Sequence, residues 1–131
     1  MRLLLDTHVA LWWIFGDPRL DDRGRRAIED DDNEAFVSVA SIWEISIKNA
    51  RPKGLPGDLL ISGGEALSEF KRAGLELLPI KAAHAVCTGE LPRVHGDPFD
   101  RMLIAQALTE TLLLVTSDGK LGEYPVSIML V

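Results

Sequence analysis

The sequence predicts a three-layer α/β fold, in which helices cover both faces of a central, mostly parallel sheet of about five strands. Two observations lead to this prediction. Short apolar segments alternate along the chain with segments of helical pattern, an alternation typical of parallel sheets. The segment RLLL at 2–5 also lacks the alternation of a half-exposed strand, so we interpret it as a strand buried on both faces.

The elements are expected in a simple alternating order. Strands are predicted at 2–5, 35–39, 75–79, 112–116 and 126–131, and helices at 7–15, 21–31, 41–49, 65–73, 81–90 and 98–109. The first helix should end at the turn formed by Gly16, Asp17 and Pro18. Asp21 or Asp22 should cap the second helix, because an aspartate accepts hydrogen bonds from the free N–H groups of a first helical turn.

The stretch from 51 to 64 is the least regular part of the chain. It carries two prolines and four glycines, a composition that favours a loop, and it is the best candidate for a mobile flap. A second loop is expected at 91–98. Pro98 suits the first position of the helix that follows, with Asp97 as its cap.

Composition indicates a single domain over residues 1–131. No apolar run approaches the ~20 residues of a membrane span, no signal peptide is evident, and no membrane partner is expected. The single cysteine, Cys87, suits a reducing cytoplasm and is expected to be a small buried hydrophobe. The net charge of −6 opposes nucleic-acid binding unless bound cations offset part of it.

Four acidic residues stand where predicted strands or helices begin or end. Asp6 and Asp118 follow strands, Asp100 opens a helix, and Glu44 lies one turn into another. Ligand sites in parallel sheets lie beyond the carboxyl ends of the strands. Crowded carboxylates raise one another's pKa, so a fold that gathers several usually holds a hard divalent cation. Metal-assisted phosphodiester hydrolysis is therefore the leading hypothesis.

Each acid also has a local structural interpretation. Asp6 could cap the helix that begins at Thr7, and Asp118 could be a turn residue before Gly119. Glu44 could close a capping box with Ser41, in which the glutamate returns to the serine backbone N–H. The hypothesis of a shared acidic site depends on all four acids occurring together.

Four separated segments resemble the signature segments of PIN-domain ribonucleases, and most closely those of VapC-type toxins of toxin–antitoxin pairs. They are LLLDTHVALWW, SVASIWEISIK, HGDPFDRMLIAQA and LLLVTSD, and they span nearly the whole chain. The resemblance implies a PIN-like fold and a metal-dependent endoribonuclease that inhibits translation. It makes Asp6, Glu44, Asp100 and Asp118 the catalytic and metal-binding carboxylates.

The resemblance also implies partners and auxiliary residues. Mg²⁺ or Mn²⁺ is the expected cofactor, RNA the substrate, a homodimer the assembly, and a small antitoxin the protein whose segment covers the acidic groove. Thr116 and Thr7 match polar positions near the site. Asp97 could join the ligands or serve only as a helix cap. His8 stands where many relatives have asparagine, and RPKGLPG at 51–57 departs from the family's more regular pattern.

Three other functions compete with this hypothesis. A haloacid-dehalogenase-type phosphatase also ends its first strand with an aspartate, but it needs a second one where His8 stands. A phosphorelay receiver needs an acid after the third strand, where Leu77, Leu78 and Pro79 provide none. A catalytically inactive PIN scaffold that only binds partners is compatible with the segments, although all four acids are present.

The remaining distinctive residues have ordinary interpretations. Trp12, Trp13 and Trp43 are expected in the core or in a subunit interface, with base stacking as the alternative. The histidines are too scattered for a zinc site. His95 is expected on a loop surface, with contact to substrate as the alternative.

Overall fold

The computed structural model describes residues 1–54 and 59–131, and a five-stranded sheet forms its centre. The strands are β1 (Arg2–Leu5), β2 (Glu34–Ser38), β3 (Glu76–Leu78), β4 (Leu113–Thr116) and β5 (Ile128–Leu130). Their order across the sheet is β3-β2-β1-β4-β5, and every neighbouring pair is parallel. The predicted parallel sheet is confirmed.

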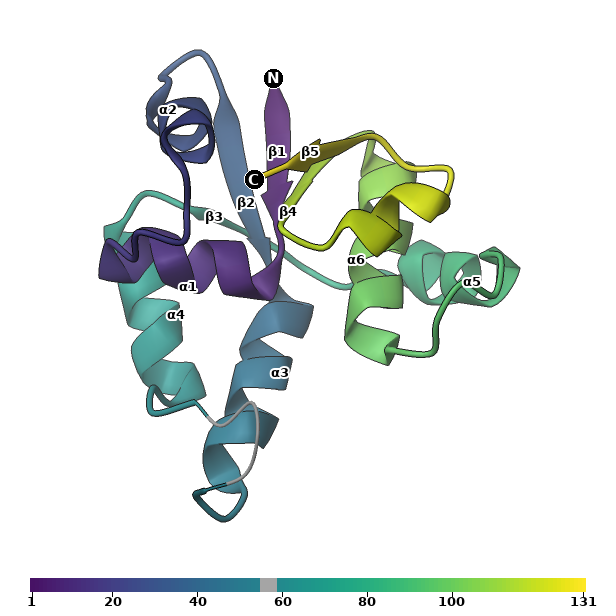
Figure 1. The fold of residues 1–131 in the computed structure, drawn as a ribbon. Coiled ribbons are helices and arrows are strands. Elements are labelled where there is room, and N and C mark those ends of the chain that lie inside the picture. Colours follow the sequence, from purple (N-terminus) through teal and green to yellow (C-terminus); the bar gives the residue numbers. More distant parts are fainter. Residues whose placement is uncertain (55–58) are drawn as a thin grey trace.

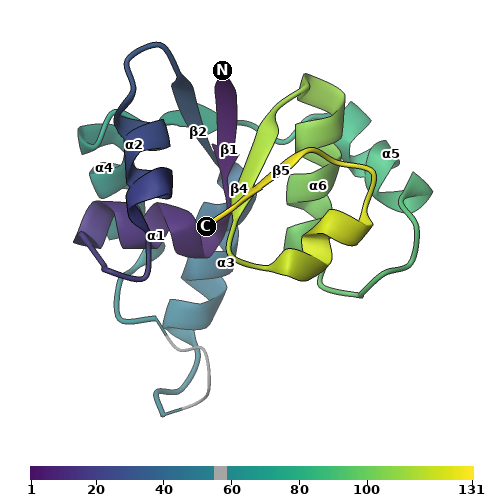
Figure 2. The ribbon, with the colours of Figure 1, turned by 45° about the horizontal axis from the view of Figure 1, so that its top comes forward.

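Helices cover both faces of this sheet. They are α1 (Thr7–Phe15), α2 (Asp22–Glu29), α3 (Val39–Ala50), α4 (Gly63–Arg72), α5 (Ala82–Glu90) and α6 (Pro98–Glu110). Figure 1 shows α1, α2 and α4 on one side of the sheet and α5 and α6 on the other, and Figure 2 shows the same separation. Helix α3 extends from the end of β2 beyond the sheet (Figure 1). The three-layer prediction is therefore confirmed.

Two apolar clusters, one on each face of the sheet, hold the layers together. Leu3 and Leu5 are buried in the cluster that includes α1 and α4, whereas Leu4 is buried in the cluster that includes α6. Successive side chains of a strand point to opposite faces, so the apolar run at 2–5 contributes to both clusters. Each fully buried leucine stabilises the fold by about 1.5–3 kcal/mol.

Helix α1 has the predicted bounds because both of its ends carry local signals. Asp6 caps it by accepting a hydrogen bond from the Val9 N–H at 2.9 Å. Gly16 ends it in the left-handed conformation, with a φ of 63°, which glycine adopts at no steric cost. Asp21 caps α2 in the same way as Asp6, accepting from the Gly24 N–H at 2.8 Å.

Helix α3 begins earlier than predicted, which corrects two expectations. The strand predicted at 35–39 ends at Ser38, whose hydroxyl accepts from the Ala40 N–H at 3.0 Å and caps α3. The capping box of Ser41 and Glu44 is therefore wrong. Both residues lie inside the helix and are buried.

Other boundaries differ by a few residues. Helix α4 starts at Gly63, inside the predicted loop, because Ser62 and Glu65 form a capping box there. Part of the flap predicted at 51–64 falls on 55–58, outside the described residues. The sequence did not predict the short 3₁₀ helix η1 (Gly119–Glu123). Predicted elements at 21–31, 75–79 and 126–131 are each shorter in the structure.

Two side chains are more exposed than the sequence suggested. Cys87 is half-buried rather than buried, because α5 packs only one side against the α6 cluster. Trp43 is 57% exposed, so the core interpretation is wrong for this residue, while Trp12 and Trp13 pack partly against the core. Within the described chain, no helix is both long and apolar enough to cross a membrane.

Candidate metal centre

The acidic residues gather where the strand order changes direction. Strand β1 lies in the middle of the sheet. It pairs with β2 on one side and with β4, which comes later in the chain, on the other side. Asp6 follows the last residue of β1, and Asp118 follows β4 after one intervening residue. In parallel sheets this switch point is where ligands bind, because the connections that leave adjacent strands diverge there.

Asp6 is buried, and both of its carboxylate oxygens accept hydrogen bonds. Its Oδ1 accepts from the Val9 N–H at 2.9 Å, and its Oδ2 accepts from the Thr116 hydroxyl at 2.5 Å. Burial raises the pKa of the Asp6 carboxyl above its ordinary value, although the bonds from Thr116 and Val9 oppose the rise. Asp6 is therefore both the cap of α1 and a fixed carboxylate of the site.

Glu44 approaches from α3 and is also buried. The Thr7 hydroxyl donates to its Oε1 at 2.7 Å, and the Ser41 hydroxyl lies 2.9 Å from the same Thr7 oxygen. Lys48, one helical turn further on, pairs with its Oε2 at 2.7 Å. The predicted auxiliary residue Thr7 thus lies in direct contact with a predicted ligand.

Asp100 lies in the first turn of α6, and Asp97 caps that helix. Asp97 Oδ1 accepts from the N–H groups of Phe99 at 2.9 Å and Asp100 at 3.3 Å, with Pro98 at the first helical position. This confirms the capping interpretation of Asp97. Burial, reinforced by the neighbouring carboxylates, raises the pKa of Asp100 to about 7.

Thr116 joins two of the acids. Its hydroxyl donates to Asp6 Oδ2 and accepts from the Asp118 N–H at 3.0 Å. Asp118 Oδ1 in turn accepts from the Lys120 N–H at 3.0 Å, as expected of a turn residue. Asp6 and Asp118 thus have the local roles that the sequence allowed, Glu44 does not, and all four acids line one pocket.

The acids line one small pocket of about 140 Å³. Its walls are formed by Asp6, Thr7, His8, Glu44, Lys48, Asp97, Asp100, Ser117 and Asp118. Lys48 is the one lysine or arginine among these residues, so carboxylates outnumber cations. Among the described residues, none donates a hydrogen bond to the Asp100 carboxylate. Oxygen donors in excess of their counter-charges fit a hard divalent cation.

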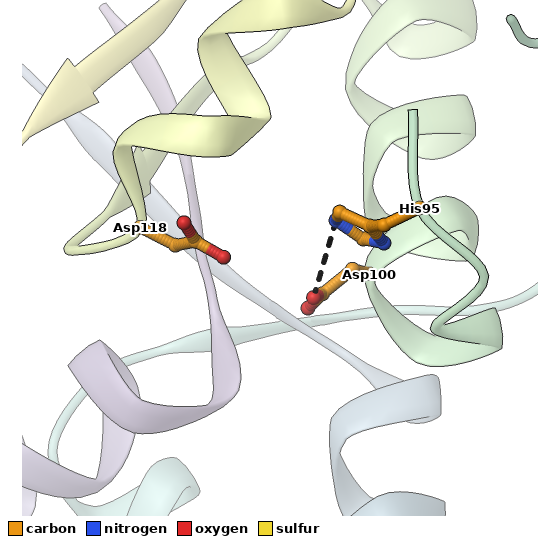
Figure 3. Close-up of side chains that lie close together, drawn as sticks. All are labelled: His95, Asp100 and Asp118. Atoms are coloured by element: carbon orange, nitrogen blue, oxygen red, sulfur yellow. Dashed lines mark ion pairs between the residues drawn. The ribbon is translucent and has the colours of Figure 1, made fainter. Parts of the chain in front are cut away.

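Three further residues of the region were missed from the sequence. Lys48 could have been found from its spacing of four residues from Glu44, which places both on one helical face. Ser41 was assigned to the helix cap instead of the site. His95 was expected on a loop surface, with contact to substrate as the alternative, and no role at the metal site was predicted for it; it lies with Asp100 and Asp118 in a group whose ligand atoms are within 4.8 Å of one another (Figure 3).

Comparison with known proteins identifies the family. A family model described as the PIN domain matches residues 3–126. Ribonuclease VapC22 of Mycobacterium tuberculosis is 34% identical over 123 residues, which cover 93% of this chain and 91% of that protein.

Solved structures share the fold at lower identity. In a VapBC2 structure from Rickettsia felis bound to a promoter DNA fragment, one chain superposes with a TM-score of 0.72 at 18% identity, covering 99% of this chain and 98% of that one. A DNA-bound VapBC structure from Salmonella typhimurium gives 0.67 at 18% identity, with coverage of 98% and 97%. The chain belongs to the PIN-domain family, in its VapC branch, as the four sequence segments predicted.

Proposed function

We propose that this protein is a metal-dependent endoribonuclease that hydrolyses RNA phosphodiester bonds as the toxin of a toxin–antitoxin pair. The observation that carries the proposal is the convergence of Asp6, Glu44, Asp100 and Asp118 on one pocket at the switch point of the sheet. The 34% sequence identity to Ribonuclease VapC22, over 93% of the chain, supports the same reaction and substrate class.

Asp6, Asp100 and Asp118 would hold Mg²⁺ or Mn²⁺, and Glu44 would complete the ligand set or orient the attacking water. Such an ion supplies a water of lowered pKa and neutralises charge that develops on the phosphate. The protein's own contribution is the placement of the carboxylates. Thr116 fixes Asp6 and the start of the Asp118 loop, and Thr7 fixes Glu44.

Lys48 fits this chemistry as a movable cation. Its ammonium group pairs with Glu44 Oε2, and its side chain is 26% exposed at the pocket wall. A flexible lysine can exchange a carboxylate partner for a phosphate oxygen of the substrate. Lys48 would therefore help an acidic protein to hold a polyanion.

The competing enzyme hypothesis lacks its second acid. His8 is exposed at the pocket wall where a dehalogenase-type phosphatase needs an aspartate for proton transfer. The inactive-scaffold alternative is compatible with the fold, but it gives no reason for four carboxylates in one pocket. Crowding them costs stability, as the raised pKa of Asp100 indicates.

The proposal includes two protein partners. An antitoxin segment that carries a basic side chain would be attracted to the acidic pocket, and the VapBC structures among the structural neighbours support such a partner. A homodimer is supported by the exposed apolar side chains of Trp43 and Ile47 on α3. A cytoplasmic location follows from an RNA substrate.

Cleavage of total cellular RNA tests the proposed function. Purified protein, shown by mass spectrometry to be free of antitoxin, is incubated with RNA in Mg²⁺, in Mn²⁺ and in EDTA. Discrete fragments should appear with either metal and vanish in EDTA and in Asp100→Asn and Asp118→Asn. Asp31→Asn, which removes the same charge from an exposed loop, should cleave like wild type. No cleavage by folded wild type in either metal would favour the binding-scaffold alternative.

The partner proposals have their own tests. If a small gene lies immediately upstream, coexpression with its product should yield a complex that cleaves no RNA. Sedimentation equilibrium of the isolated chain should give twice the mass of one chain. A monomer at all concentrations would contradict the homodimer.

A further inference from the structure

His95 lies beside the acidic pocket, on the loop that leads into α6, and the chemistry proposed above gives it no role. Figure 3 shows its ring directed at Asp100, with Asp118 facing the same space from the start of η1. A histidine placed in this way could bind a metal through a ring nitrogen, or it could donate a hydrogen bond to a carboxylate. The two roles require different protonation of the ring.

The backbone contact of the ring decides between these roles. The Asp97 N–H donates to His95 Nδ1 at 3.3 Å. A neutral imidazole carries one proton, so a ring that accepts at Nδ1 carries that proton on Nε2. This tautomer is assigned from the hydrogen bond. With its proton in place, Nε2 has no lone pair to offer a metal and can act only as a donor.

The Nε2 donor is buried without a hydrogen-bond partner in the described part of the chain. The carboxylate oxygen that faces it is Asp100 Oδ2, at 3.8 Å. A hydrogen bond between these atoms requires about 2.9 Å, so a movement of about 1 Å would form one. The movement is favourable for both groups, because a buried donor and a partly buried carboxylate are each unfavourable when unpaired.

The loop that carries His95 is held from outside the pocket. The Tyr124 hydroxyl accepts from the His95 N–H and donates to the His95 carbonyl, both at 3.2 Å, and its ring packs edge-on against the imidazole. Arg101 donates to the carbonyls of Thr88 at 2.8 Å and Pro92 at 2.9 Å. The imidazole is therefore held by contacts outside the pocket, whereas no described residue donates a hydrogen bond to the Asp100 carboxylate.

We propose that His95 is a positioning residue, whose Nε2–H donates to Asp100 Oδ2 and turns the other oxygen of that carboxylate toward a divalent cation. The inference rests on the proposed function, because it needs Asp100 to be a metal ligand. Hydrogen bonds to ligating side chains orient them, and their loss typically weakens metal binding by about 10–100-fold. His95 thus acts on the ion through Asp100.

Mn²⁺ affinity of the full, metal-freed chain tests this role without recourse to activity. Isothermal titration calorimetry is run on wild type, His95→Gln, His95→Asn and His95→Leu. Glutamine carries its amide nitrogen at the level of Nε2, whereas asparagine reaches only the level of Nδ1 and leucine has no donor. All three lose the ring, so loss of packing is shared, and thermal melts in EDTA check the fold.

His95→Gln should bind Mn²⁺ within about threefold of wild type, and the Asn and Leu variants should bind about tenfold or more weakly. Affinities unchanged in the Asn and Leu variants would overturn the inference. So would equal weakening of all three, since the ring itself would then be required. Folded wild type that binds no Mn²⁺ would contradict the proposed function, a result distinct from both.

Discussion

Replacement of Asp100 by asparagine should stabilise the metal-free protein while abolishing its metal chemistry. In the folded chain the pKa of Asp100 is raised from 3.8 to about 7, because the carboxyl is buried among other carboxylates. The folded state therefore holds the proton more tightly than the unfolded state. Above the folded pKa the carboxylate is charged in both states, but the charge is unfavourable only in the folded state. The charge therefore lowers the free energy of unfolding.

The size of the effect follows from the two pKa values. A difference of about three pH units at about 1.4 kcal/mol each gives an upper limit of about 4 kcal/mol. The Asp100 side chain is 29% exposed, so solvent screens part of this, and we expect about 2 kcal/mol. The substitution removes no helix cap, because Asp97 and not Asp100 caps α6.

Thermal and urea unfolding in EDTA, at about pH 8 and about pH 5, measure this effect. Asp100→Asn should be more stable than wild type by about 2 kcal/mol at pH 8 and by about a third of that at pH 5. The difference grows between about pH 4 and about pH 7, because the wild-type carboxylate destabilises the folded state increasingly over that range. Saturating Mg²⁺ should reverse the order, because only wild type gains binding energy. A variant less stable than wild type at pH 8, or a stability difference independent of pH, would show that the Asp100 charge does not destabilise the folded state.

Three further substitutions probe the supports of the site. Thr116→Val should lower the free energy of unfolding by about 1–3 kcal/mol in a urea titration and weaken Mn²⁺ binding, because Asp6 loses its buried donor. The control, Thr109→Val on the exposed face of α6, should lower it by under about 0.5 kcal/mol. Arg101→Ala should cost about 2 kcal/mol and speed amide hydrogen exchange in the loop at 91–97, because the guanidinium binds the carbonyls of Leu91 and Pro92; unchanged exchange would contradict this role. Lys48→Met should raise the KM for RNA several-fold, because it removes the pocket's ammonium group; an unchanged KM in steady-state assays would leave Lys48 without a role in substrate binding.

The sequence predicted the parts of the fold that local signals determine. The apolar run at 2–5, the cap at Asp6 and the stop at Gly16 each act within a few residues, so β1 and α1 were predicted to the residue. The start of α3 was ambiguous, because Ser38 and Ser41 can each cap a helix. Tertiary packing decides between them: Ser41 is buried beside Thr7, which makes it part of the helix.

The four acids were predicted because they stand in the four segments that resemble PIN-domain signatures, and they line one pocket of the structure. The positioning role proposed for His95 was not predicted, because it depends on the contact of Nδ1 with the Asp97 backbone and on the position of Asp100 in the first turn of α6. These are properties of the folded loop that residue spacing does not encode. The same holds for the clamp of Arg101 on carbonyls of the preceding helix and loop.

A crystal structure of the protein with Mn²⁺, with anomalous data collected at the manganese edge, would show whether the acidic pocket binds a divalent cation. An anomalous peak should lie within bonding distance of carboxylate oxygens of Asp6, Asp100 and Asp118. Asp100→Asn crystals should lose or weaken that peak. Saturating Mn²⁺ with no peak in the acidic pocket, or a peak bound only elsewhere on the chain, would contradict the account.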